Sequence, residues 1–378
     1  MKYTKRVAEG IVKRLLKAFP VIGVTGPRQS GKSTLLQHLL KDYEYVTFDD
    51  ITMIQRYEED PVGFMERYSK KVIFDEVQLV PQIFSSIKLL VDQNRSEYGN
   101  FVLTGSSQFS FLKSASESLA GRIGLLSLLP FQMSETPKAL IEESIYRGSY
   151  PELVMRSYEE SYLWYTSYVD TYLNKDLRTL AEIGDIRDFR RLLQLLAANV
   201  SQTVDYSYYA KSIGVSSPTI KRWISILEAS YIIFLVPPYF ENYGKRITKS
   251  PKIYFYDCGL VSFFTGIKTF EQYDQGPLAG ALFENYVISE LYKKELHELG
   301  DGELYFLRTQ DKAEIDLIID RKTSRELYEI KKSATFRPNM ARHLKSFRKS
   351  EDTCTIIYQG NDDLFQKIKL RHYLNALS

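Results

Sequence analysis

The chain has 378 residues, which is too long for one ordinary hydrophobic core and predicts two to three domains. With 44% hydrophobic and 26% charged residues it has the composition of a soluble globular protein, and no stretch approaches the ~20 apolar residues that span a bilayer. The net charge of +3 gives no whole-chain argument for nucleic acid, so any DNA-binding surface is expected to be local.

Residues 1–20 are basic and amphipathic and lack the apolar run and cleavage site of a signal peptide. The two cysteines, Cys258 and Cys354, are far apart and make neither a disulfide framework nor a zinc site. Both observations favour the reducing cytoplasm, and no membrane partner is expected.

A short apolar run at Val21–Thr25 predicts a buried strand that leads directly into a glycine loop and then a helical pattern. The loop fits G-x-x-x-x-G-K-[ST], and strand, loop and helix are the context that this phosphate-binding motif requires. We expect Lys32 to reach the β- and γ-phosphates of ATP and the Ser33 hydroxyl to ligate Mg²⁺. The expected nucleotide-binding residues of the loop are Gly26, Pro27, Arg28, Gln29, Ser30, Gly31, Lys32, Ser33 and Thr34.

The segment Lys71–Glu76 reads as a second buried strand that ends in two acidic residues. Asp75 stands at the carboxyl end of this strand, where ligands bind in open α/β sheets, and is expected to hold the Mg²⁺ shell. Glu76 follows directly and can polarise the attacking water as a general base. The alternative is an Asp-Glu pair in an exposed turn.

A third strand is predicted at Asn100–Thr104 and is followed by Gly105-Ser106-Ser107. Thr104 or Ser106 is the candidate for a polar residue beside the γ-phosphate. A simple serine N-cap of the next helix, predicted over Gln108–Ala120, is an equally good interpretation.

The order of these motifs resembles the AAA-type P-loop ATPases. Within them, the chain resembles a large group of prokaryotic ATP-binding proteins, through Gly26-Pro27-Arg28-Gln29 and the box from Phe74 to Gln78. The resemblance implies an α/β fold with a parallel sheet for an ATPase domain at 1–145, and ATP hydrolysis as the activity.

Two further residues take their roles from this resemblance. Arg122, just before a strand predicted at Ile123–Leu129, would be an arginine finger that acts on the nucleotide of a neighbouring copy, which implies a homo-oligomer. The alternatives are a salt-bridged surface arginine and a contact with its own subunit's nucleotide.

Arg147–Pro151 resembles a Gly-x-Pro element near adenine, so Pro151 would touch the base. Its spacing is one residue longer, and a helix-capping Gly and N1 Pro compete with this reading.

Residues 146–187 are expected to form a helical lid or linker, because Glu152–Leu180 carries tyrosines at helical spacing. Residues 188–257 then favour a winged helix-turn-helix. Helices are predicted at Phe189–Val200 and Asp205–Ile213, and a third is capped by Ser216-Ser217-Pro218. Wing strands would follow at Tyr231–Val236 and Lys252–Tyr256.

In a DNA reader, Thr219, Lys221 and Arg222 of the third helix would face the major groove, and Lys245 and Arg246 would reach phosphates. A winged helix attached to an AAA domain also serves as a protein–protein joint. Because the basic count is modest, both readings stay open.

Residues 258–378 turn to an α/β mixture with a helix at Gly280–Leu291, and strands are predicted at Glu303–Leu307, Lys312–Ile319, Leu327–Lys331 and Thr355–Tyr358. The order of a helix Glu, a strand Asp and a Glu-x-Lys resembles restriction-endonuclease-like PD-(D/E)xK domains. The residues that carry it are Glu284, Asp316, Glu329 and Lys331.

The chemistry of a metal nuclease explains these residue types. Asp316 and Glu329 on adjacent strands would put two carboxylates on one Mg²⁺, and Glu284 could hold metal or water. Lys331 shares a strand face with Glu329 and could stabilise the phosphorane charge. A degenerate domain, in which these carboxylates form salt bridges with Lys312 or Lys331, is the alternative.

Three functions therefore compete. The first is an ATP-driven protein that acts on nucleic acid, with a Mg-dependent nuclease domain. The second is an ATP-controlled assembly switch whose C-terminal domain only binds. The third is a protein-remodelling ATPase without nucleic acid.

Overall fold

The computed structural model describes residues 3–105, 108–173, 186–240, 250–309 and 313–377. The chain divides into two compact units. The first contains residues 1–131, 229–231 and 296–299, and the second contains the rest. The finer division with boundaries after residues 145, 187 and 257 stays a prediction. In the part of the chain that the structure describes, no helix combines the length and the apolar character needed to cross a bilayer.

The first unit alternates strands and helices along the chain. Its strands are β1 (Val21–Thr25), β2 (Glu44–Thr47), β3 (Val72–Asp75), β4 (Phe101–Gly105) and β5 (Ile123–Ser127). Its helices are α1 (Glu9–Ala18), α2 (Lys32–Leu39), α3 (Ile51–Glu59), α4 (Pro61–Arg67), the 3₁₀ turn η1 (Val77–Leu79), α5 (Ile83–Gln93) and α6 (Gln108–Leu119). Sequence patterns predicted β1, β3, β4, β5, α2 and α6, and missed β2, α3, α4 and α5.

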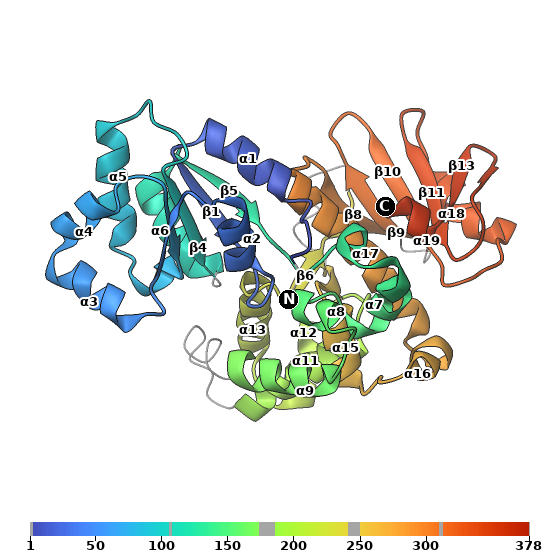
Figure 1. Ribbon diagram of the computed structural model, residues 1–378. Coiled ribbons are helices and arrows are strands. Elements are labelled where there is room, and N and C mark those ends of the chain that lie inside the picture. The colour runs from blue at the N-terminus through green and yellow to red at the C-terminus, as the bar shows by residue number, and fades with distance from the viewer. Residues whose placement is uncertain (1–2, 106–107, 174–185, 241–249, 310–312, 378) are drawn as a thin grey trace. The chain divides into compact units, whose positions relative to one another are not determined.

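The five strands form one parallel sheet in the order β2-β3-β4-β1-β5. Both faces are buried, because neighbouring residues of one strand, such as Val21 and Ile22, point into two different hydrophobic clusters. Helices α1 and α2 cover one face and α3 to α6 the other (Figure 1). The parallel order brings the carboxyl ends of β1, β3 and β4 to one edge, where ligands bind in such sheets.

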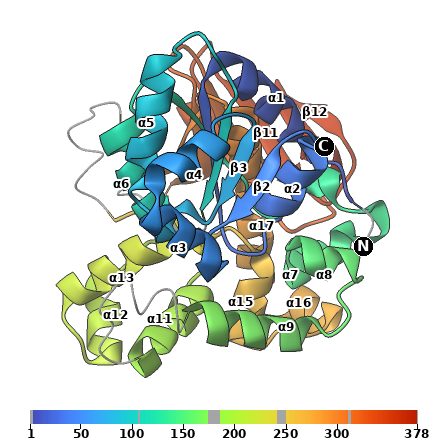
Figure 2. The same cartoon turned by 60° about the vertical axis from the view of Figure 1, so that its left-hand side comes forward.

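The second unit begins with helices. They are η2 (Met133–Glu135), η3 (Lys138–Leu140), α7 (Ile141–Arg147), α8 (Pro151–Met155), α9 (Ser161–Tyr168), the π-helical η4 (Val169–Leu173), α11 (Ile186–Ala198), α12 (Tyr206–Ile213) and α13 (Ser217–Ala229). The helical pattern predicted from Glu152 is interrupted between α8 and α9, where Ser157, Tyr158 and Glu160 adopt positive φ angles. Helices α11, α12 and α13 form one group (Figure 2).

The strands β6 (Ile233–Val236) and β7 (Lys252–Phe255) pair in antiparallel fashion. After them come α15 (Cys258–Thr265), α16 (Phe270–Gln275) and α17 (Ala279–Glu298). The remaining elements are β8 (Glu303–Arg308), β9 (Glu314–Asp320), β10 (Arg325–Ile330), η5 (Pro338–Ala341), α18 (Arg342–Phe347), β11 (Thr353–Tyr358), β12 (Asp363–Phe365), β13 (Ile368–His372) and α19 (Tyr373–Ala376). Six of these strands form a mixed sheet in the order β12-β13-β11-β10-β9-β8.

A buried carboxylate connects three helices of the second unit. Asp257 caps α15 by accepting the amide of Leu260, and it also accepts the amide of Ser149 at 2.6 Å and the hydroxyl of Tyr165 at 2.6 Å. Burial raises the pKa of this carboxyl, and the hydrogen bonds oppose that shift. The turn between α7 and α8 must approach the carboxylate closely, and Gly148, with φ +86°, allows it.

Replacement of Gly148 by Ala tests this packing. A Cβ at Gly148 would lie 2.3 Å from the Tyr165 hydroxyl and 2.5 Å from Asp257 Oδ1, on a backbone that L residues rarely adopt. We expect a loss of unfolding free energy of ~1–3 kcal/mol. Thermal unfolding of Gly148→Ala should therefore show a clear drop in Tm.

The matched control is Gly280→Ala in α17, where a Cβ meets nothing within 4 Å. That change should be neutral or stabilising, because Ala is the better helix former. Equal Tm values for Gly148→Ala and the wild type would contradict the account of this turn.

Candidate functional site

The glycine loop joins β1 to α2 in a conformation that only its sequence permits. Gly26 has φ +145°, and a Cβ there would lie 2.1 Å from the Leu128 carbonyl oxygen. Gln29 and Gly31 also have positive φ angles, of 65° and 90°. A loop with these left-handed residues ahead of a helix N-terminus is typical of sites that bind anions.

The Lys32 side chain folds back into this loop. Its Nζ donates to the carbonyl oxygens of Gly26 at 3.0 Å and Pro27 at 2.9 Å. Burial lowers the pKa of Lys32 to about 8, against the opposing effect of Glu76 and Asp75. The Ser30 hydroxyl is buried and has no hydrogen-bond partner among the described residues. A buried ammonium and an unpaired buried hydroxyl are both groups that a bound phosphate would satisfy.

Asp75, the last residue of β3, accepts hydrogen bonds from three hydroxyl groups. Ser33 Oγ of α2 donates to Asp75 Oδ2 at 2.8 Å, Tyr45 of β2 donates to the same oxygen, and Thr104 of β4 donates to Oδ1. Three neighbouring strands and α2 thus converge on one carboxylate. A serine hydroxyl next to an aspartate at a phosphate-binding loop fits the donor set of a nucleotide-bound Mg²⁺.

Glu76 directly follows β3 in the left-handed conformation, with φ 56°. Its carboxylate accepts a hydrogen bond from the Gln78 side-chain amide. Glu76 is partly exposed and follows Asp75 at the same edge of the sheet. This is a suitable place for a group that takes a proton from water.

Arg122 forms an intramolecular ion pair. Its Nε and Nη2 lie 2.9 and 2.7 Å from Asp92 Oδ1, and Nη2 also contacts Oδ2 at 3.1 Å. This arrangement is the salt-bridged arginine that the sequence left open as an alternative. A contact with a neighbouring copy's nucleotide stays a prediction.

The structure gives the positions of other predicted site residues, and their roles stay predictions. Pro151 is the first residue of α8, after the capping Gly148, and its contact with adenine stays a prediction. Lys221 and Arg222 lie exposed on α13, and the Thr219 hydroxyl is 2.8 Å from that of Ser216. Ser106, Lys245, Arg246 and Lys312 lie outside the described residues.

The four predicted nuclease residues come together in the second unit. Lys331 Nζ lies 3.2 Å from Asp316 Oδ2 and 2.8 Å from Glu329 Oε1. Asp316 also accepts the amide of Ile330 at 2.7 Å. Glu284 of α17 adjoins the same group, since the Asp316 carboxylate contributes to the raised pKa of Glu284.

Three residues that the sequence did not single out complete this carboxylate cluster. Lys252 of β7, almost fully buried, bridges Glu284 Oε1 at 3.1 Å and Glu314 Oε1 at 2.5 Å. The Tyr254 hydroxyl donates to Glu284 at 2.7 Å. The spacing of Glu314 from Asp316 and of Lys252 from Tyr254 places each pair on one strand face, but nothing local indicates that β7 meets α17 and β9.

The cluster is electrostatically unbalanced. It contains the carboxylates Glu284, Glu314, Asp316 and Glu329 against the ammonium groups of Lys252 and Lys331, and the Arg308 guanidinium lies 3.8 Å from Glu314 at its edge, so the acidic groups still outnumber the basic ones. Burial, and then repulsion by Asp316, raises the pKa of Glu284 to about 7 and that of Glu329 to about 8.

No group of three or more His, Cys, Asp or Glu side chains within the described ranges is arranged to hold a metal ion. Two carboxylates nevertheless suffice for Mg²⁺, which protein sites usually bind through one or two carboxylates together with substrate phosphates. Asp316 and Glu329 fit this description. Glu329 Oε2 is buried and has no hydrogen-bond partner among the described residues.

Three family models match the chain. Residues 18–136 match a model described as an AAA domain. Residues 138–271 and 279–375 match two domains of unknown function, DUF8612 and DUF4143. The AAA match covers the parallel sheet and the phosphate-binding loop, so the first unit contains a P-loop domain of the AAA type, as predicted.

The chain is 31% identical over 352 residues to the uncharacterized protein Rv2008c of Mycobacterium tuberculosis, and the match covers 92% of this chain and 77% of that protein. A Walker-type ATPase of Pyrococcus abyssi has 15% identity and a TM-score of 0.46, with 68% of this chain and 94% of that chain covered. AMPPCP-bound DnaA from Aquifex aeolicus has 14% identity and a TM-score of 0.31, with 59% and 84% covered.

Removal of the Thr104 hydroxyl tests the arrangement around Asp75. We expect Thr104→Val to slow ATP turnover by ~10-fold or more with little change in nucleotide affinity, because a partner that orients a metal-binding carboxylate is lost. Steady-state turnover and ATP binding of the purified protein measure the two effects.

The control is Thr25→Val, an equally buried threonine at the end of β1 whose hydroxyl lies 2.7 Å from that of Tyr231. Turnover reduced to the same degree in both variants would show that the Asp75 contact has no special role.

Proposed function

The chain belongs to the family of the mycobacterial protein Rv2008c, and on that premise we propose that it binds ATP with Mg²⁺ at the glycine loop and hydrolyses it. The AAA domain match makes the chain a P-loop protein, and the hydrolysis and the residue roles are our proposal. The observation that carries it is the convergence of Ser33, Tyr45 and Thr104 on Asp75 at the edge of the sheet where the loop lies.

In this proposal the loop amides and Lys32 hold the β- and γ-phosphates. The Lys32 ammonium leaves the carbonyl oxygens of Gly26 and Pro27 for phosphate oxygens, which restores the charged form that burial disfavours. Bound Mg²⁺ neutralises charge that develops on the phosphates. Asp75 and Ser33 would hold it, while Tyr45 and Thr104 keep the carboxylate in place.

Glu76 acts as the general base that takes a proton from the attacking water. In this proposal the carboxylate of Asp75 orients the metal, and that of the next residue, Glu76, takes the proton.

Substitution of the proposed base separates binding from chemistry. Glu76→Gln should retain ATP binding and lower kcat by ~10²–10⁴-fold, because a general base is lost without a change in shape. Lys32→Ala should instead weaken ATP binding by ~10-fold or more, because charge-assisted hydrogen bonds to phosphate disappear. Calorimetric titration and a phosphate-release assay on the full chain distinguish the two.

Unchanged turnover in Glu76→Gln would assign the base elsewhere, and full turnover in Lys32→Ala would remove the ATPase proposal. Glu44→Gln, an exposed carboxylate of β2 in the same sheet, is the control and should behave as wild type.

For Arg122 we keep the proposal of a role in trans. The Asp92 pair must then open when copies assemble. Turnover that depends on protein concentration and loses that dependence in Arg122→Ala would support the role, whereas equal loss at all concentrations would reject it.

A second function is supported by the carboxylate cluster. We propose that residues 258–378 form a PD-(D/E)xK-type domain that cleaves phosphodiester bonds with Mg²⁺. Glu284, Asp316, Glu329 and Lys331 come from α17, β9, β10 and the residue after it, and they meet although 47 positions separate the first from the last. Such convergence is the specific feature that a chance motif lacks.

In this domain Asp316 and Glu329 would hold Mg²⁺, and the excess of carboxylates over basic groups in the cluster favours a bound cation. The metal supplies Lewis acidity at the phosphate when it is bound. Lys331 moves from the carboxylates to a non-bridging phosphate oxygen, and Glu284 accepts a proton from water. Lys252 and Tyr254 keep Glu284 in position.

Cleavage of plasmid and single-stranded DNA with Mg²⁺ tests this function. Asp316→Asn should abolish cleavage, since it removes a metal ligand without a change in volume. Asp320→Asn, at the other end of β9, is the matched control and should cleave normally. Cleavage that persists in Asp316→Asn would contradict the proposal, and no cleavage by the wild type under any condition would leave the ATP-controlled switch as the function.

The arrangement of α11, α12, α13, β6 and β7 supports a winged helix for residues 188–257, because helices followed by an antiparallel strand pair have that order. We propose that the exposed Lys221 and Arg222 of α13 contact DNA and bring it to the carboxylate cluster. Strand β7 joins the two, since Lys252 and Tyr254 belong to it and contact Glu284.

A further inference from the structure

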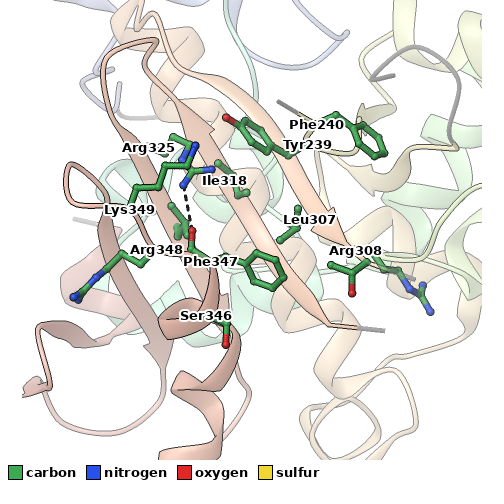
Figure 3. A pocket seen from close by; sticks show the side chains of 12 residues that line it. Tyr239, Phe240, Leu307, Arg308, Ile318, Arg325, Ser346, Phe347, Arg348 and Lys349 are labelled. Carbon is green, nitrogen blue, oxygen red and sulfur yellow. Dashed lines mark hydrogen bonds between the residues drawn. The ribbon is translucent and has the colours of Figure 1, made fainter. Parts of the chain in front are cut away.

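A pocket of about 560 Å³ opens on the C-terminal sheet (Figure 3). This volume lies within the ~300–1,000 Å³ that is usual for small-molecule sites. Strands β8, β9 and β10, the end of α18 with the segment after it, and the segment after β6 form its walls. The lining residues are Tyr239, Phe240, Leu307, Arg308, Thr309, Ile318, Arg325, Leu327, Ser346, Phe347, Arg348 and Lys349.

The floor of the pocket is apolar and its flanks are aromatic. Ile318 and Leu327 face each other across β9 and β10, and Tyr239 and Phe240 lie together at one side in Figure 3. The segment that carries these two rings is held at the sheet edge, because Tyr239 donates its amide to the Phe306 carbonyl at 2.6 Å. Flat rings over an apolar floor suit the stacking of a planar group.

The rim of the pocket is basic. Its described lining includes Arg308, Arg325, Arg348 and Lys349 and contains no Asp or Glu. Arg325 is committed to Asp352, at 2.5 Å, and stacks over Tyr239. Arg308, Arg348 and Lys349 are the other basic residues of the lining, and Arg308 also lies 3.8 Å from Glu314, so the pocket suits a ligand with an anionic group next to a planar one.

The pocket adjoins the carboxylate cluster on one face of β10. Side chains alternate along this regular strand, so Arg325, Leu327 and Glu329 share a face. Leu327 lines the pocket and Glu329 belongs to the cluster, two residues or ~7 Å further along. Arg308 of the pocket also lies 3.8 Å from Glu314 of the cluster.

We infer that this pocket binds an unpaired nucleotide of a single-stranded nucleic acid, with the base stacked between the aromatic side chains and its phosphates held by Arg308, Arg348 and Lys349. The strand then continues over Glu329, so that the next phosphodiester reaches Asp316 and Lys331. The inference rests on the proposal that the C-terminal domain acts on nucleic acid, and it adds the substrate class. A duplex cannot enter, because its bases are already stacked and paired.

Fluorescence anisotropy of labelled oligothymidylate of about 12 nucleotides, titrated with the full chain in EDTA without ATP, tests the pocket without any cleavage. Phe240→Leu keeps the apolar volume but removes a ring, and we expect ~5-fold or greater weakening. Arg348→Ala/Lys349→Ala should weaken binding and reduce the slope of log Kd against log salt by ~1.4, since two phosphate contacts are lost.

The matched control is Arg342→Ala/Lys345→Ala, which removes the same charge from the exposed face of α18 outside the pocket. It should bind as wild type. Thermal unfolding and ATP turnover of every variant show whether it is folded. A hairpin duplex, titrated in parallel, should bind the pocket variants as tightly as it binds the wild type.

Equal weakening in the pocket and control variants, or wild-type protein that binds no oligothymidylate, would overturn the inference. The experiments distinguish a failure of the proposed cleavage from a failure of the proposed pocket. Pocket-dependent binding without Mg²⁺-dependent cleavage would keep the inference and remove the nuclease, whereas cleavage with normal binding in Phe240→Leu and Arg348→Ala/Lys349→Ala would keep the nuclease and remove the pocket.

Discussion

The nucleotide site depends on the hydrogen bonds that the Asp75 carboxylate accepts. It accepts the hydroxyls of Ser33, Tyr45 and Thr104 and so fixes α2, β2 and β4 to the end of β3. The three hydroxyl donors hold this buried carboxylate in one orientation. The glycine loop can then take a strained path around phosphates, because the residue that follows Lys32 is already anchored. The site is therefore organised by contacts within the chain.

The second unit contains a cluster in which buried carboxylates lie close together, which costs electrostatic free energy. Its carboxylates exceed its ammonium groups, and burial, followed by repulsion from Asp316, raises the pKa values of Glu284 and Glu329. Buried ion pairs seldom add stability, because desolvation offsets their attraction. A cluster of this kind is better explained by a ligand that completes it than by the fold. A divalent ion and a phosphodiester would satisfy both its excess charge and the unpaired Glu329 oxygen. The adjoining pocket, with its basic and aromatic side chains, would suit the neighbouring nucleotide of a single-stranded nucleic acid.

Much of the first unit could be predicted from local sequence. The glycine loop and the Asp75-Glu76 pair are recognisable motifs, and the buried strands are continuous apolar runs. Tyr45 was missed, since β2 has a mixed pattern with two exposed residues and no motif. In the second unit, Asp316, Glu329 and Lys331 could be found from strand alternation. Lys252 and Tyr254 could not, because only the packing of β7 against α17 brings them to Glu284. The pocket is likewise a product of tertiary contacts between strands and loops far apart in the chain.

The direct test of the central claim is a calorimetric titration of the full chain with ATP, once with Mg²⁺ and once with EDTA. If Asp75 and Ser33 hold a nucleotide-bound metal, ATP binds in a one-to-one ratio, and binding is tighter with Mg²⁺ than with EDTA. Absence of binding at millimolar ATP, or equal affinity under both conditions, would contradict the account of this site.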